Sequence, residues 1–216
     1  MNKAAIFDLD GTILDTLGDI ADNINLMLEK YGYKKRTTEE VMQFIGCGSK
    51  NLARLSIPVE VTEEELEERH AYYNRIYTES GSPKTHVFDG IREVMQNLKE
   101  RGYKTAILTN KPQITTDDVY KTYMFDLGLD LVIGQRAGVK IKPDPTSALE
   151  ILKQFDVEPK NAYFIGDGET DVMTALNGGM QGIAVLWGYR SKEQLEKAGA
   201  KVFAKTPKDL LKLITL

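Results

Sequence analysis

Only one cysteine, Cys47, occurs in the 216 residues, so no disulfide can form within one copy of the chain. This scarcity is typical of a reducing compartment, and we expect a cytoplasmic protein. Long apolar runs are missing too, since none approaches the roughly 20 residues that a membrane-spanning helix needs. The first apolar stretch ends at Asp8 and does not resemble a signal peptide. The sequence therefore predicts no membrane partner.

An excess of basic residues is also lacking, because 28 Lys and Arg stand against 32 Asp and Glu, for a net charge of -4. Binding along a nucleic-acid backbone needs a basic face, so nucleic acid is not expected as the main partner. A small anionic substrate remains compatible, since a local cationic pocket or a bound metal can override net charge. Nothing in the composition indicates the oligomeric state.

Histidine is also scarce, with two in the chain. His70 and His86 lack the spacing of metal ligands, and no histidine lies near Cys47 in the sequence to activate it as a nucleophile. Zinc chemistry and thiol catalysis are therefore not favoured.

Short apolar runs alternate with amphipathic helical patterns over most of the chain, which predicts an α/β fold with a parallel sheet. The expected strands are 4–7, 105–108, 131–133, 162–165 and 182–186. A helical block interrupts this alternation, with helices expected to begin at two capping boxes, Thr37 with Glu40 and Thr62 with Glu65. We interpret residues 16–86 as a helical cap domain inserted into a core of residues 1–15 and 87–216.

Polar residues follow three of the expected strands directly. They are Asp8 and Asp10, Thr109 and Asn110, and Asp167 and Asp171, while Lys142 lies in a loop before a helix. Ligands of open α/β sheets bind outside the carboxyl ends of the strands, so these side chains are expected to converge if their strands are neighbours.

A set of carboxylates needs a hard cation among them, and magnesium binds carboxylate oxygens, waters and a phosphate oxygen. Asp8 and Asp167 could supply such oxygens, and Asp171 could order a metal-bound water. A carboxylate that attacks phosphorus gives an aspartyl-phosphate, and Mg²⁺ with Lys142 would offset the negative charge of the phosphate. Asp10 could protonate the leaving oxygen and then activate water.

The motifs together resemble the four-motif signature of the haloacid dehalogenase superfamily. The matching residues are Asp8-Leu9-Asp10-Gly11-Thr12, Thr109, Lys142-Pro143 and Gly166-Asp167-Gly168-Glu169-Thr170-Asp171. The resemblance implies a Rossmann-like core with a helical cap between the first and second motifs. It also implies Asp8 as nucleophile, Asp10 as acid and base, and a metal held by Asp8, the Asp10 carbonyl and Asp167. Thr109, Lys142 and the backbone amide of Asn110 would hold the phosphate.

Within the superfamily the chain looks most like the phosphoglycolate phosphatase family. The stretches 108–112 and 44–48 are similar to that family's second motif and to its glycine-containing cap loop. Gly46 and Gly48 allow close backbone approach, and Lys50 could meet a substrate carboxylate. We expect a small phosphorylated metabolite such as phosphoglycolate. A nucleotide, pyrophosphate or a sugar phosphate stays open.

Other activities are less compatible with the residues. A related phosphomutase would have a histidine in the first cap helix, where Leu17-Gly18-Asp19-Ile20 stands, and a dehalogenase would lack Asp10. A phosphonate-cleaving relative would use a cap lysine to form a Schiff base, for which Lys50 is the candidate. A receiver module would have no cap, and a non-catalytic binding protein would have lost a catalytic residue.

Overall fold

The first apolar run forms β1 (Ala4–Phe7) at the centre of a six-stranded sheet in the computed structural model, which describes residues 2–215. β1 is fully buried and pairs in parallel with one strand on each side. The sheet order is β5-β4-β1-β6-β7-β8. The other strands are β4 (Lys104–Pro112), β5 (Leu131–Gln135), β6 (Ala162–Gly166), β7 (Gln181–Val185) and β8 (Phe203–Ala204).

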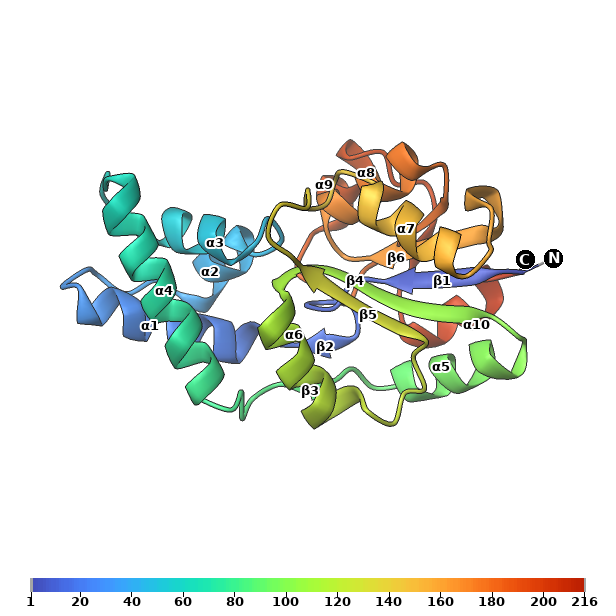
Figure 1. The fold of residues 1–216 in the computed structure, drawn as a ribbon, viewed down its shortest axis with the longest axis horizontal. Helices are drawn as coiled ribbons and strands as arrows, with labels where there is room; N and C mark the ends of the chain where they lie inside the picture. The colour runs from blue at the N-terminus through green and yellow to red at the C-terminus, as the bar shows by residue number, and fades with distance from the viewer. Residues whose placement is uncertain (1, 216) are drawn as a thin grey trace.

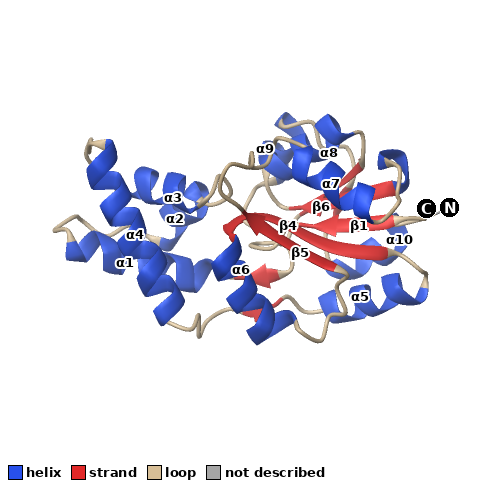
Figure 2. Ribbon diagram, in the orientation of Figure 1, coloured by secondary structure: helices blue, strands red, loops and turns tan. Residues whose placement is uncertain are grey.

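Helices cover both faces of this sheet (Figure 2). Alternate residues of β1 point to opposite faces, so Phe7 packs with α5 (Ile91–Glu100) and Ile6 packs with α7 (Thr146–Gln154). The remaining core helices are α6 (Gln113–Val119), the π-helical turn η1 (Tyr120–Met124), the 3₁₀ turn η2 (Pro159–Asn161), α8 (Glu169–Gly178), α9 (Lys192–Lys197), the 3₁₀ turn η3 (Pro207–Asp209) and α10 (Leu210–Leu213).

A separate helical lobe lies beside the sheet (Figure 1). It consists of α1 (Leu17–Lys30), α2 (Thr38–Phe44), α3 (Ser49–Ser56) and α4 (Glu63–Glu79). These helices share an apolar cluster, which Tyr189 of the core also joins. The two predicted capping boxes, at Thr37 and Thr62, are both formed. The chain enters and leaves the lobe through β2 (Leu14–Asp15) and β3 (His86–Val87), which pair with each other.

The predicted fold class, an α/β core with a parallel sheet and an inserted helical cap, is confirmed. The division into residues 1–15 with 87–216 and residues 16–86 stays our proposal, and the β2–β3 pair at both crossings supports it. The sequence patterns missed that pair and the edge strand β8, because elements of two residues are too short to show a period. Among residues 2–215, none of the helices is both long and apolar enough to cross a membrane.

Candidate active site

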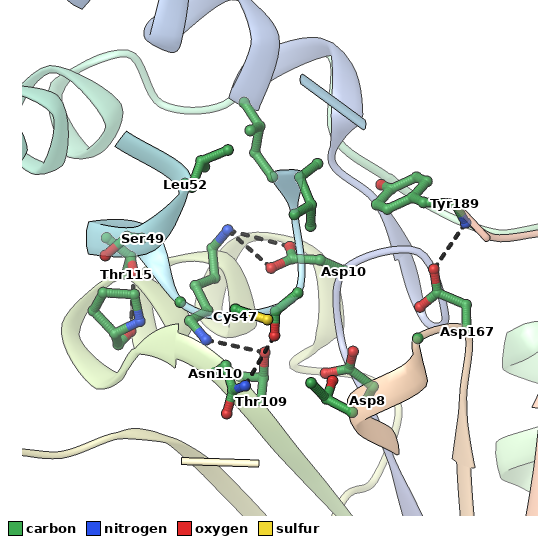
Figure 3. Close-up of a pocket in the computed structure, with 18 of the residues that line it drawn as sticks. Asp8, Asp10, Cys47, Ser49, Leu52, Thr109, Asn110, Thr115, Asp167 and Tyr189 are labelled. Carbon is green, nitrogen blue, oxygen red and sulfur yellow. Dashed lines mark hydrogen bonds and ion pairs between the residues drawn. The ribbon is translucent and has the colours of Figure 1, made fainter. Parts of the chain in front are cut away.

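The predicted motif residues meet at the carboxyl edge of the sheet, beneath the helical lobe (Figure 3). Asp8 follows β1, Thr109 lies near the end of β4, and Asp167 follows β6. Because β1 pairs with both β4 and β6, these three strand ends are neighbours. A pocket of about 80 Å³ lies between this edge and the cap loop that contains Gly46 and Gly48.

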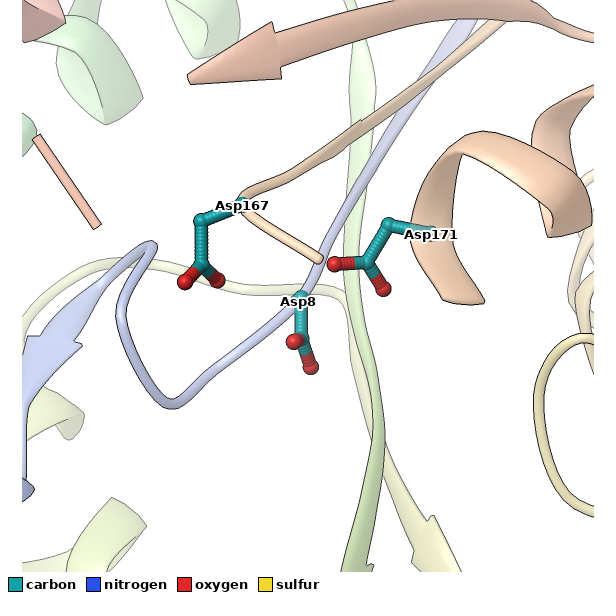
Figure 4. A group of neighbouring side chains, drawn as sticks. All are labelled: Asp8, Asp167 and Asp171. Atoms are coloured by element: carbon teal, nitrogen blue, oxygen red, sulfur yellow. The ribbon is translucent and has the colours of Figure 1, made fainter. Parts of the chain in front are cut away.

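Three carboxylates form the most acidic part of the site (Figure 4). One oxygen each from Asp8, Asp167 and Asp171 lies within 4.8 Å of the others. Asp167 and Asp171 are buried, and the Asp8 side chain is 12% exposed. Burial, followed by the charge of Asp171, raises the pKa of Asp8 well above its usual value and that of Asp167 to about 7. Ionised carboxylates this close together repel one another. A divalent cation bound between their oxygens would offset that repulsion.

Asp167 is fixed from two directions. Its Oδ1 accepts a hydrogen bond from Thr12 Oγ1 at 3.0 Å, and its Oδ2 accepts one from the backbone N–H of Tyr189 at 2.8 Å. Two glycines leave room for this carboxylate, since a Cβ added at Gly11 or Gly188 would lie only 2.3 Å from an Asp167 side-chain atom. The loops that contain Gly11 and Gly188 therefore approach the Asp167 side chain closely, which a residue with a Cβ would prevent.

Lys142 lies between two of the carboxylates. Its Nζ is 2.7 Å from Asp8 Oδ1 and 2.6 Å from Asp171 Oδ1, and the residue is only 3% exposed. Burial lowers the pKa of Lys142, but the charges of Asp171 and Asp8 outweigh that effect and hold the pKa above its usual range. The other Asp171 oxygen accepts from the N–H of Gly168 at 2.9 Å, so Asp171 also orders the start of α8.

Asp10 has different partners from the acidic cluster. Its Oδ1 accepts from Thr16 Oγ1 at 2.7 Å and lies 3.2 Å from Lys111 Nζ. The same Nζ donates to the phenol oxygen of Tyr77, in α4, at 3.0 Å. Asp10 is therefore held at the boundary between core and cap.

Asn110 contributes more than the backbone amide that the sequence predicted. Its Nδ2 donates to the carbonyls of Gly46 at 2.9 Å and Lys142 at 3.1 Å, and its Oδ1 accepts from the N–H of Lys142 at 2.9 Å. One buried side chain thereby joins β4, the Lys142 loop and the cap loop. Thr109 beside it lines the pocket, as predicted from its strand end.

The expected contact of Lys50 with substrate is not supported by its position. Gly46 and Gly48 line the pocket, but Lys50 does not. Its Nζ pairs with Glu63 at 2.7 Å and Glu67 at 2.5 Å on the adjacent helix α4, and its side chain is 41% exposed. The sequence could not show this, because the acidic face of α4 reaches Lys50 only once α3 and α4 pack together.

Sequence reasoning missed the loop that follows β7. Tyr189 and Arg190 both line the pocket, and the Tyr189 hydroxyl accepts from the N–H of Thr16 at 2.9 Å. Arg190 pairs with Glu169 at 2.9 Å. Its guanidinium also donates to cap carbonyls, namely those of Met42 at 2.9 Å, Gln43 at 3.2 Å and Ile45 at 2.5 Å. The one available signal was that this loop follows a predicted strand end.

Comparison with known proteins gives consistent matches. The family described as Haloacid dehalogenase-like hydrolase matches residues 5–185. Phosphoglycolate phosphatase 1 of Pseudomonas aeruginosa is 28% identical over 214 residues, which cover 97% of this chain and 78% of that protein. The phosphoglycolate phosphatase of Nitrosospira multiformis is 29% identical over 191 residues, which cover 87% of this chain and 84% of that protein.

Two solved structures share the fold over nearly the whole chain, the helical lobe included. A proposed phosphoglycolate phosphatase from Lactobacillus delbrueckii subsp. bulgaricus is 33% identical, with a TM-score of 0.90 and 99% of both chains covered. A predicted phosphoglycolate phosphatase from Haemophilus somnus is 25% identical, with a TM-score of 0.91, and the match covers 99% of this chain and 98% of that one.

Proposed function

The chain belongs to the haloacid dehalogenase-like hydrolase family, and from this we propose that it hydrolyses a small phosphate monoester through an aspartyl-phosphate on Asp8. The observation that carries the proposal is the convergence of Asp8, Lys142 and Asp167 at one edge of the sheet, with Asp10 facing the same pocket. A nucleophile, a cation, a metal ligand and a proton carrier are what phosphoryl transfer through a carboxylate requires.

Members of this family generally use a divalent metal, and the acidic cluster fits one. We propose Mg²⁺, held by carboxylate oxygens of Asp8 and Asp167 and by the Asp10 carbonyl. Asp171 contributes directly or through water. When bound, the cation supplies positive charge that offsets the phosphate and the carboxylates around it. Mg²⁺ prefers a few carboxylates and waters. Each Asp167 oxygen accepts one hydrogen bond and keeps a further lone pair for a cation.

Asp8 attacks phosphorus, and Lys142 neutralises charge beside it. Lys142 is held by both Asp8 and Asp171, so its ammonium stays next to the phosphate oxygens that gain charge in the transition state. Thr109 and the backbone amide of Asn110 bind the phosphate from the β4 side. In this scheme the Asn110 side chain is a positioning group, because it fixes the backbone of Lys142 and of the cap loop.

Asp10 carries protons in both halves of the reaction. In the first half it protonates the oxygen of the leaving alcohol as that oxygen departs from phosphorus. In the second half it takes a proton from the water that attacks the aspartyl-phosphate. Its hydrogen bond from Thr16 and its ion pair with Lys111 hold it away from the acidic cluster, which gives two nearby carboxylates separate tasks.

The small pocket favours a small substrate. About 80 Å³ is well below the 300–1,000 Å³ typical of sites for larger ligands, so a nucleotide fits less well than a two- or three-carbon phosphate. Relatives named phosphoglycolate phosphatase support phosphoglycolate as a preferred substrate. A cytoplasmic location belongs to the same proposal, since the exposed thiol of Cys47 beside the pocket suits a reducing compartment.

The test is a phosphatase screen with Mg²⁺ against phosphoglycolate, nucleotides, pyrophosphate and sugar phosphates, reported as kcat/KM. We expect phosphoglycolate to give the highest value. A bulky sugar phosphate or nucleotide that equals it would overturn the substrate while leaving the chemistry intact. Absence of phosphate release from every compound would overturn the phosphatase itself.

Replacing Asp10 by Asn should slow both proton transfers. General acid–base residues contribute about 10²–10⁴-fold, so kcat should fall within that range while the fold survives. Steady-state phosphate release measures the loss, and circular dichroism checks the fold. A loss well under tenfold would show that the proton comes from another group.

The thermal stabilisation by Mg²⁺ should grow between pH 6 and pH 8. The pKa of Asp167 is raised from 3.8 to about 7, so its protonated form stabilises the metal-free fold below pH 3.8, and this contribution is lost as pH rises through 7. Metal ligands must be deprotonated, so Mg²⁺ binds better above pH 7 and stabilises the protein most there. The rise in Tm with saturating Mg²⁺ measures this, and equal rises at both pH values would contradict it.

A further inference from the structure

The basic side chains around the pocket differ in how many acidic and carbonyl groups each one contacts. Arg190 is held by Glu169 and by three cap carbonyls, and Lys142 is held by Asp8 and Asp171. Lys50 does not line the pocket. Lys111 remains as the pocket cation that faces the cap and is not committed to the acidic cluster.

Lys111 lies in an irregular stretch of β4. The pairing of β4 with β5 changes register between Leu108 and Pro112, and such bulges turn side chains away from simple alternation. Thr109, Asn110 and Lys111 all line the pocket, which strict alternation would not allow for three consecutive residues. The Cα atoms of Thr109 and Lys111 are two residues apart, which is at most about 7 Å of extended chain.

The Lys111 ammonium has capacity for another acceptor. Within residues 2–215 its Nζ makes three hydrogen bonds, to Asp10 Oδ1 at 3.2 Å, to Asp10 Oδ2 at 3.4 Å and to the Tyr77 hydroxyl at 3.0 Å. The two to Asp10 are long and go to one carboxylate, so one of these N–H groups can turn to another acceptor. An ammonium carries three donors that can be redistributed. Asp10 keeps its hydrogen bond from Thr16 Oγ1 at 2.7 Å, so Lys111 can bind another anion without leaving Asp10 unsupported.

We propose that Lys111 is a specificity-determining residue that binds a second anionic group of the substrate, a carboxylate joined to the phosphate by a short carbon chain. This rests on the phosphatase function proposed above. A carboxylate gains a charge-assisted hydrogen bond at a side chain that is only 9% exposed, whereas an uncharged tail would bury the ammonium without that partner. The same contact selects against phosphate esters with apolar tails.

The experiment compares two substrates of matched size in the Mg²⁺-loaded enzyme. 2-Phosphoglycolate and ethyl phosphate differ in that a carboxylate replaces a methyl group. Wild-type enzyme should prefer phosphoglycolate in kcat/KM. In Lys111→Met this preference should fall by roughly 10- to 100-fold, the loss expected for one hydrogen bond to a charged group. In Lys111→Arg, which keeps the charge, much of the preference should remain.

The ratio between the two substrates separates recognition from indirect effects. If Lys111→Met slows both substrates equally, Lys111 only positions Asp10, and the inference is wrong. Lys50→Met provides a second comparison. If Lys50→Met changes the ratio and Lys111→Met does not, the substrate carboxylate is bound by Lys50 and the inference is wrong.

The wild-type measurements keep the inference testable even if Lys111→Met does not fold. Equal rates with the two substrates would overturn the role of Lys111 while the phosphatase stands. If neither compound nor any other phosphate ester is hydrolysed, the proposed function fails and the inference fails with it.

Discussion

Asp8→Asn should abolish turnover, with kcat falling by roughly 10⁴-fold or more, as other enzymes show on losing a nucleophile. The amide keeps the shape of the carboxylate but has no oxygen anion to attack phosphorus. It also offers a weaker metal ligand. Both losses affect the chemical step directly, so raising the substrate concentration should not restore activity.

The fold should survive this change. Burial and the charge of Asp171 raise the pKa of Asp8, which means that a charged carboxylate is costly at this position in the absence of metal. Lys142 keeps its 2.6 Å contact with Asp171 when Asp8 is neutral. We therefore expect the metal-free Tm of Asp8→Asn at neutral pH to equal or exceed that of the wild type.

Phosphate release and acid-quench mass spectrometry measure the effect. The wild type should carry phosphate on the peptide that contains Asp8 during turnover, and Asp8→Asn should carry none. Asp10→Asn is the matched control, because it loses one charge nearby but retains the nucleophile. Substantial activity in a folded Asp8→Asn protein would refute the covalent mechanism.

Removal of divalent cations should abolish activity just as completely. Around the pocket, five carboxylates face three cations, so ionisation of all of them leaves an excess of two negative charges. The acidic residues are Asp8, Asp10, Asp167, Glu169 and Asp171, and the basic residues are Lys111, Lys142 and Arg190. An anionic phosphate is repelled by that excess, and one divalent cation balances it.

The measurement is activity after treatment with a chelator, followed by addition of single metals. Mg²⁺ should restore full activity, whereas Ca²⁺ should not, because it takes 6–8 ligands in looser geometry and misplaces the attacking carboxylate. Asp167→Asn should need much more Mg²⁺ than the wild type. Full activity in excess chelator would contradict the proposed metal site.

The sequence predicted those features that depend on neighbours in the chain. A capping box such as that of Thr37 needs only residues three apart, and Asp8 could be placed because an apolar run precedes it directly. The order of the motifs then placed Asp167 at the same edge of the sheet. These are local signals, and the parallel fold brings them together by a general rule.

Contacts between distant segments could not be predicted in this way. Arg190 meets cap carbonyls about 150 residues earlier in the chain, and backbone carbonyls carry no sequence signal. The positions of two lysines also could not be predicted from the sequence. Lys50 was predicted to meet a substrate carboxylate but pairs with Glu63, whereas Lys111 lines the pocket between Asp10 and Tyr77.

The contacts of Arg190 and Asn110 with the cap have a consequence for how such an enzyme can diverge. Within the cap, both residues donate to carbonyl oxygens, from Met42 to Gly46, and not to side chains. Mutations along that segment can therefore change the chemical character of the pocket wall while the contacts that dock the cap persist. Selection for a new metabolite can therefore act on the side chains of Cys47 or its neighbours without disturbing cap docking. The backbone carbonyls of this segment bind the core, whereas Cys47 and its neighbours line the pocket.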